Sequence, residues 1–151
     1  MLENYIIPLP VVKQIDFDDI LGIDLDQVAA DVAHILVPFK CEVVRAQLII
    51  TETCGGTTTP GVVKFDKRPT AGDAAARGDG DIAEFNMAAT AAGNVLYDEV
   101  ASGTILNAGD EVVVEITTAP VDAAAGHFEP VLLVKPMSES LANLADMVET
   151  A

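Results

Sequence analysis

The sequence predicts an all-β fold, a single antiparallel β-sandwich of jelly-roll-like type. Several segments alternate apolar and polar residues with a period of two, as a strand with one buried face does. Turn-forming Gly, Asn, Asp and Pro separate these segments at intervals of roughly ten residues, and no strand–helix alternation indicates parallel units. Half of the 151 residues are apolar, which is enough for the core of one domain.

Two segments alternate most clearly. In residues 41–52 we expect the even positions to face the core, and in residues 111–118 the apolar residues to do so: Val44, Ala46, Leu48 and Ile50; Val112, Val114 and Ile116. Further strands are predicted at residues 35–37, 63–66, 83–87 and 95–100. The run Val131–Val134 is continuously apolar, which is typical of a central strand covered on both faces. The sandwich domain is therefore expected to span residues 32–136.

Residues 1–31 are interpreted as an N-terminal arm. Pro8 and Pro10 favour an extended backbone over a helix. The arm's apolar side chains are candidates for an interface with a partner: Ile6, Ile7, Leu9, Val11, Val12 and Phe17. An arm packed on its own domain is the equally favoured alternative. A short helix is expected over residues 24–31, with Asp24 as its N-cap.

The C-terminal residues 137–151 are expected to form a tail with a short helix. Apolar residues fall at helical spacing there, at Leu141, Leu144, Ala145 and Val148. Ser138 or Ser140 would cap this helix.

The charge balance limits the partners. The chain has 24 acidic and 8 basic residues, a formal net charge of -16. This excess opposes binding to nucleic acid or to an anionic membrane, and neither a membrane-spanning segment nor a secretory signal is expected. Seven acidic residues and one Lys lie in the first 31 residues, so we expect this region to face a basic groove on a partner.

No residue pattern indicates catalysis or a cofactor. His34 and His127 have no second ligand at metal-binding spacing, and Cys41 and Cys54 are expected to be free thiols. Asp73, Asp79 and Asp81 fall in a glycine-rich loop, which we interpret as a solvated turn, with a calcium site as the alternative. The chain is therefore expected not to be an enzyme.

One resemblance rests on residues 41–51, a Gly/Thr loop, and the segment 103–116 with its Leu106-x-x-Gly109-Asp110-x-Val112 turn. Together they resemble the capsid decoration (cement) proteins of tailed bacteriophages, over residues 32–136. The resemblance implies a non-enzymatic virion protein without a cofactor, made in the host cytoplasm and not secreted. Such a protein would bind the outer capsid surface, bridge neighbouring major capsid subunits and form a homo-oligomer, a trimer more than a dimer.

Three alternatives remain open at this point. The chain could belong to a phage tail, neck or fibre instead of the capsid. It could be a small ligand- or receptor-binding module that recognises its target through the loop 69–80. It could be an enzyme that uses Cys41 or Cys54 as a nucleophile.

Overall fold

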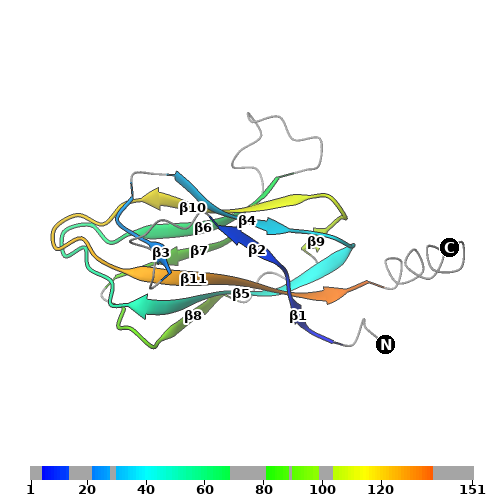
Figure 1. Ribbon diagram of the computed structural model, residues 1–151, viewed down its shortest axis with the longest axis horizontal. Coiled ribbons are helices and arrows are strands. Elements are labelled where there is room, and N and C mark those ends of the chain that lie inside the picture. The colour runs from blue at the N-terminus through cyan, green and yellow to red at the C-terminus, as the bar shows by residue number, and fades with distance from the viewer. Residues whose placement is uncertain are drawn as a thin grey trace, which may run out of the picture.

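The computed structural model describes residues 5–13, 22–27, 30–68, 81–88, 90–98 and 104–137. These residues form an all-β molecule of two antiparallel sheets without a helix among them (Figure 1). The strands are β1 (Ile7–Pro8), β2 (Val11–Lys13), β3 (Ile23–Asp24), β4 (Ala30–Leu36), β5 (Cys41–Glu52), β6 (Val62–Arg68), β7 (Asp81–Asn86), β8 (Val95–Asp98), β9 (Ile105–Leu106), β10 (Glu111–Thr118) and β11 (His127–Pro136).

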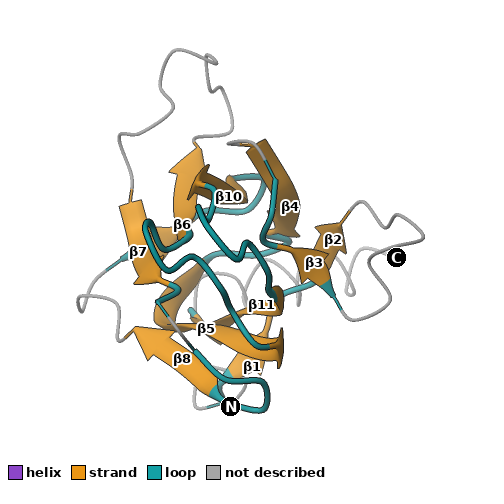
Figure 2. Ribbon diagram, turned by 90° about the vertical axis from the view of Figure 1, so that its left-hand side faces the viewer, coloured by secondary structure: helices purple, strands orange, loops and turns teal. Residues whose placement is uncertain are grey.

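The first sheet, called sheet A, has the order β1-β11-β5-β8, with β3 also beside β11 and β9 beside β5. The second, sheet B, has the order β2-β4-β10-β6-β7. Figure 2 shows the two sheets as separate layers. The partners nest along the chain, since β3 pairs with β11, β4 with β10, β5 with β8 and β6 with β7. Each sheet is therefore built from segments distant in sequence.

The core lies between the two layers. Phe128 and Leu132 of sheet A and Phe65 and Ile116 of sheet B have no exposed surface. The rings of Phe65 and Phe85 meet edge to face, with centroids 5.9 Å apart. Burial of a large apolar side chain contributes about 1.5–3 kcal/mol relative to exposure, so these contacts dominate the stability.

The inward positions of the two long strands are as predicted, with one exception. Ala46, Leu48 and Ile50, and also Val112, Val114 and Ile116, are buried in the core: all are at most 1% exposed. The prediction that Val44 faces the core is wrong: its side chain is half-buried, while Val43 is 2% exposed. The register between β5 and β11 shifts there, since Arg45 pairs with Leu133 but Val43 pairs with Val134. This bulge changes the face to which the following residues point.

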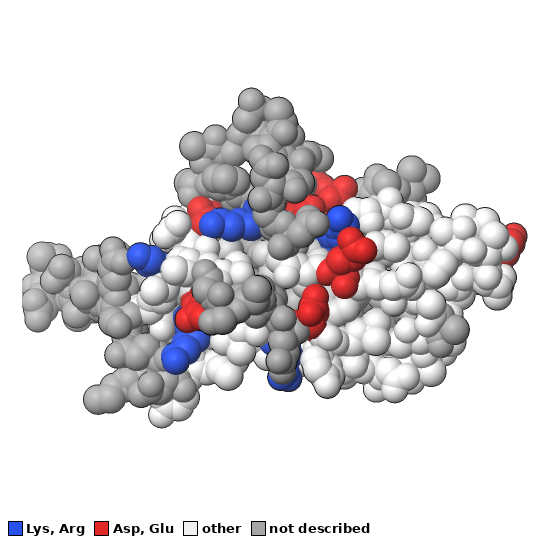
Figure 3. Space-filling model, turned by 180° about the vertical axis from the view of Figure 1, so that it is seen from behind, with Lys and Arg blue, Asp and Glu red and all other residues white. Residues whose placement is uncertain are grey.

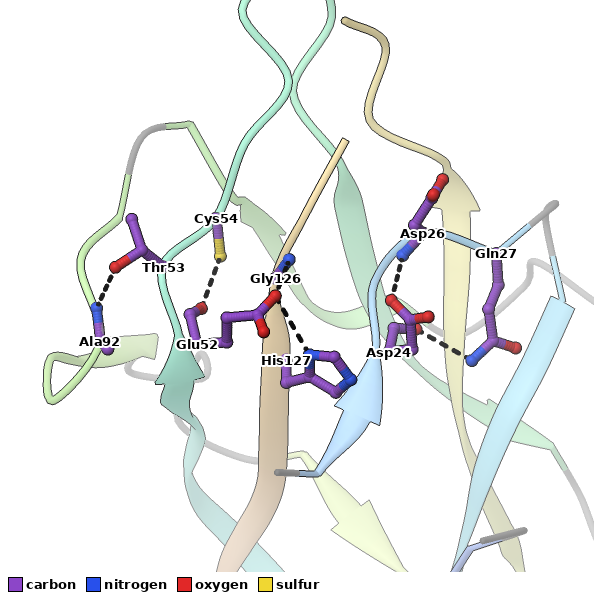
Figure 4. A network of polar contacts seen from close by, with 9 residues as sticks. All are labelled: Asp24, Asp26, Gln27, Glu52, Thr53, Cys54, Ala92, Gly126 and His127. Atoms are coloured by element: carbon purple, nitrogen blue, oxygen red, sulfur yellow. Dashed lines mark hydrogen bonds and ion pairs between the residues drawn. The ribbon is translucent and has the colours of Figure 1, made fainter. Parts of the chain in front are cut away.

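The helix expected over residues 24–31 is wrong. Asp24 ends β3, and β4 already begins at Ala30. The Asp24 carboxylate accepts the N–H of Asp26 at 2.9 Å, and the Asp24 carbonyl accepts a hydrogen bond from the Gln27 side chain (Figure 4). The side chain expected to cap a helix instead closes a local turn, which the same chemistry allows.

The boundary expected at residue 32 is also wrong, because residues 5–13 belong to the sandwich. β1 pairs with β11 at the edge of sheet A, and β2 pairs with β4 at the edge of sheet B. Leu9, between them, is 4% exposed, and its N–H donates to the Leu132 carbonyl at 3.0 Å. The arm packed on its own domain is therefore the alternative that holds here.

Several sequence-predicted features lie outside the described residues. These are Phe17, Asp73, Asp79 and the C-terminal helix of residues 138–151. Asp81 opens β7, but its side chain is not described.

Candidate functional site

The two thiols lie at opposite ends of the longest strand. Cys41 begins β5 and Cys54 follows its end, and both are buried and free. A twelve-residue strand spans roughly 40 Å, so the two sulfur atoms are too far apart for a disulfide. Burial, together with the nearby Asp110 carboxylate, raises the pKa of Cys41 to about 12. Burial and Glu52 raise the pKa of Cys54 as well. Thiols with raised pKa values carry little thiolate at neutral pH, which disfavours the nucleophile hypothesis.

The two histidines each face a carboxylate. His34 Nδ1 lies 2.6 Å from Glu111 Oε1 on the outer side of sheet B, and both side chains are nearly half exposed. His127 is mostly buried, with Nδ1 3.3 Å from Glu52 Oε1. The Glu52 carboxylate also accepts the N–H of Gly126 at 3.0 Å (Figure 4). Within the described part of the chain, no group of three or more His, Cys, Asp or Glu residues could hold a metal ion.

The outer side of sheet A carries an apolar surface. Six side chains on β1, β5, β8 and β11 make up what we call the sheet A face: Pro8, Ile49, Val95, Tyr97, Val131 and Leu133. Val95 is 46% exposed, Tyr97 61% and Ile49 39%, while Val131 and Leu133 are half-buried. Ile49 pairs with Val95, and Leu133 pairs with Pro8. Between β11 and β8, the outward side chains beside Val131 and Leu133 are the polar Gln47 and Arg45 of β5.

This surface bears on the prediction that residues 131–134 are covered on both faces. Leu132 and Val134 are fully buried between the sheets. Val131 and Leu133 point the other way and stay partly exposed. The described structure therefore covers one side of this strand only.

Among the described residues of β5 and β11, four charged side chains lie on or beside the sheet A face, two of each sign. Glu42 and Glu129 are acidic, and Arg45 and Lys135 are basic. The Arg45 guanidinium lies 4.9 Å from the centroid of the Tyr97 ring, a cation–π contact. Lys13 of β2 forms an ion pair with Glu129. On a chain of net charge -16, this region is electrically balanced.

The outer side of sheet B is acidic by contrast. Among the side chains described there, four exposed or partly exposed carboxylates and one lysine follow its strands: Asp31, Glu84, Glu111, Glu115 and Lys64. Lys64 lies 3.1 Å from Glu84 on the neighbouring strand. At the centre of this side, Val113 and Asp66 form a buried cross-strand pair.

A third surface is the end of the molecule where β5 stops and β11 begins. Seen from behind, charged side chains gather over one half of the molecule, and the half toward this end is almost free of them (Figure 3). The loops of residues 53–61 and 119–126 contain one charged residue, Asp122. Their backbones pair through hydrogen bonds such as Thr57 N–H to the Asp122 carbonyl at 3.0 Å.

The edge closed by β1 and β2 exposes a second apolar group, which we call the N-terminal edge. Its members are more than half exposed: Tyr5 (62%), Ile6 (57%), Val12 (53%) and Leu36 (51%). Pro8 and Pro10 are exposed beside them, and the Pro10 carbonyl accepts the N–H of Leu36 at 2.9 Å.

The sequence-predicted interface residues thus separate into two groups. Ile6 and Val12 are exposed on the N-terminal edge. Ile7 and Val11 are partly buried against the core, and Leu9 is inside it, so Leu9 is not free to contact a partner. Sequence reasoning missed the exposed residues Ile49, Val95, Tyr97 and Leu36. The apolar run 131–134 was the signal available for the sheet A face.

Comparison with known proteins adds no relative. No protein-family model matches the chain, and neither a curated protein nor a solved structure is significantly similar to it. Among the residues that the structure describes, there is no helix long and apolar enough to cross a membrane.

Proposed function

We propose that this chain is a non-enzymatic structural protein that decorates a bacteriophage capsid. It would bind the outer surface and bridge neighbouring major capsid subunits. The nested strand pairing supports a jelly-roll assignment, a class that includes viral capsid domains. Because one fold serves many functions, the surface of the chain and not its fold indicates what it binds.

The observation that carries the proposal is the N-terminal edge. Four large apolar side chains stand more than half exposed, Tyr5 and Ile6 just before β1, Val12 on β2 and Leu36 on β4. Single exposed apolar residues are ordinary, but a group of them with polar surroundings marks a protein interaction site. Pro8 and Pro10 interrupt the row of backbone donors there, so side-chain contacts and not strand addition would provide the binding energy.

The charge of the same region indicates the partner's chemistry. Residues 1–31 contain seven acidic residues and one Lys. A basic groove between neighbouring capsid subunits would complement this charge and raise the association rate. The proposed contact therefore combines apolar anchors with an acidic flank.

Substitutions on the N-terminal edge test the proposal better than removal of the segment. Deleting residues 2–14 would remove β1, β2 and the buried Leu9, and it would damage the fold itself. The double variant Ile6→Glu/Val12→Glu instead places charge on two exposed positions. We expect it to bind purified capsids that lack the protein at least about tenfold more weakly than the wild type in co-sedimentation.

Val121→Glu is the matched control for the charge. Val121 is 48% exposed, close to the 53% of Val12, and lies in the loop between β10 and β11. This variant should sediment with capsids as the wild type does. The proposal would be contradicted if the double variant bound capsids as tightly as the wild type. It would also be contradicted if the wild type sedimented with phage tails but not with capsids.

A further inference from the structure

We infer that the sheet A face packs against the same face of a second copy of this chain. The inference concerns a surface that borders the N-terminal edge at Pro8, and it stands without the proposed function. It rests on the charge pattern along β11 and on the exposed apolar side chains beside that strand.

Net charge restricts where two copies can meet. Each copy carries a formal charge of -16, and like charges brought together across an interface oppose association by several kcal/mol. The outer side of sheet B, with Glu84, Glu111 and Glu115, would place acids against acids. On the outer side of sheet A, the charged side chains that the structure describes on β5 and β11 are two acidic and two basic, beside the apolar residues of the sheet A face.

The outward residues of β11 are self-complementary. In chain order they are Glu129, Val131, Leu133 and Lys135, and the inward residues alternate with them. A two-fold axis in the plane of the interface, perpendicular to β11 at Leu132, reverses this row. It sets Glu129 against Lys135 of the second copy and Val131 against Leu133 of the second copy. The same surface then serves both partners, as a two-fold interface requires.

The neighbouring strands extend this contact. On β5, Arg45 lies beside Leu133 and Gln47 beside Val131, while Ile49 lies beside Glu129. The exposed Val95 and Tyr97 of β8 lie beyond Ile49 and Gln47. Glu129 is also paired with Lys13, which holds its carboxylate at the border of the face. Tyr97 offers a large rigid ring with Arg45 beside it, and both residue types are enriched in interfaces.

Charge reversal tests the pairing directly. Glu129→Lys and Lys135→Glu each place two like-charged pairs across the proposed interface. Each should raise the dissociation constant of the two-copy species about tenfold or more, measured by sedimentation velocity of the full chain without any partner. The double variant Glu129→Lys/Lys135→Glu should return to within about threefold of the wild type.

Recovery of association in the double variant would come from pairing between residues 129 and 135 of different copies. Residues 129 and 135 lie six positions apart on one strand, roughly 20 Å, so they cannot pair within a copy. Thermal unfolding of each variant identifies loss of the fold. Lys135→Glu leaves the Lys13–Glu129 ion pair in place, so its effect on association is independent of that contact.

A wild-type chain that stays monomeric at about 100 µM would overturn the inference. Single variants with the dissociation constant of the wild type would overturn it too. So would a double variant that associates as weakly as the single variants. A monomer that still binds capsids would overturn this inference and leave the proposed function intact.

Discussion

The outer sides of the two sheets follow the same alternation but carry opposite kinds of residues. The central strand of sheet B, β10, directs Glu111 and Glu115 outward, and the central strand of sheet A, β11, directs Val131 and Leu133 outward. Both strands bury their inward side chains, such as Val112 and Val114 of β10 and Leu132 and Val134 of β11, in the same core. The alternation of side chains along a strand therefore determines which residues form the core. The outward residues indicate what the outer side of each sheet contacts. For sheet A, we infer a second copy of the chain.

The largest expected effect is a difference in the free energy of unfolding between substitutions on the two sides of β11. Leu132 is fully buried and Leu133, its neighbour, is half-buried on the opposite side. Leu132→Ala should lower the free energy of unfolding by about 2–5 kcal/mol, because it leaves a cavity between the sheets. Leu133→Ala should lower the free energy of unfolding of the monomer by about 1 kcal/mol or less. Urea unfolding in the dilute, monomeric range compares the two, and equal losses would mean that Leu133 belongs to the core.

The next effect compares the same substitution on the two sheets. Lys135→Glu on sheet A should raise the dissociation constant of the two-copy species about tenfold. Lys64→Glu on sheet B changes the net charge equally and removes the contact with Glu84. It should leave association unchanged and alter stability by about 1 kcal/mol or less. If both variants dissociate the pair alike, net charge and not the sheet A face controls association.

The smallest effect concerns the inward side of sheet A. Cys41 is buried there, and its pKa is raised from 9.0 to about 12. The folded chain therefore keeps its proton at pH values where the unfolded thiol loses it. The stability associated with this thiol is fully present below pH 9.0 and is lost as the pH rises toward about 12. Urea unfolding midpoints should fall as the pH rises from about 9 toward about 12, and less so in Cys41→Ala. An identical fall in that variant would assign the effect to other groups.

The long strands could be predicted from the sequence because their evidence is local. Residues 41–52 and 111–118 alternate over enough positions to define both their ends and their inward side, and β5 and β10 have these same bounds. The predicted alternation is wrong at Val44, because the bulge there depends on the register with β11, about ninety residues away in the chain.

The N-terminal strands could not be predicted in the same way. β1 and β3 have two residues each, and both are defined by pairing with β11 at the far end of the chain. Asp24 suits a helix cap and a local turn equally well, and only its neighbours in space decide between them. The prolines remove the alternation that would have placed Leu9 in the core.

The candidate surfaces divide similarly. Ile6 and Val12 could be named from the sequence as exposed apolar residues of a proline-containing segment. Tyr97 and Ile49 could not, since their side of sheet A follows only from the pairing of β5 with β8. The apolar run at residues 131–134 did indicate a strand with two covered sides, and the described structure supplies one of them.

The most direct test mixes the two single charge variants. Glu129→Lys has basic residues at both ends of the outward row of β11, and Lys135→Glu has acidic residues at both ends. Each should be weak in pairing with itself, but an equimolar mixture should form mixed pairs at least about tenfold more tightly than either variant alone in sedimentation velocity. A mixture that sediments as the sum of its two components would contradict the contact between two sheet A faces.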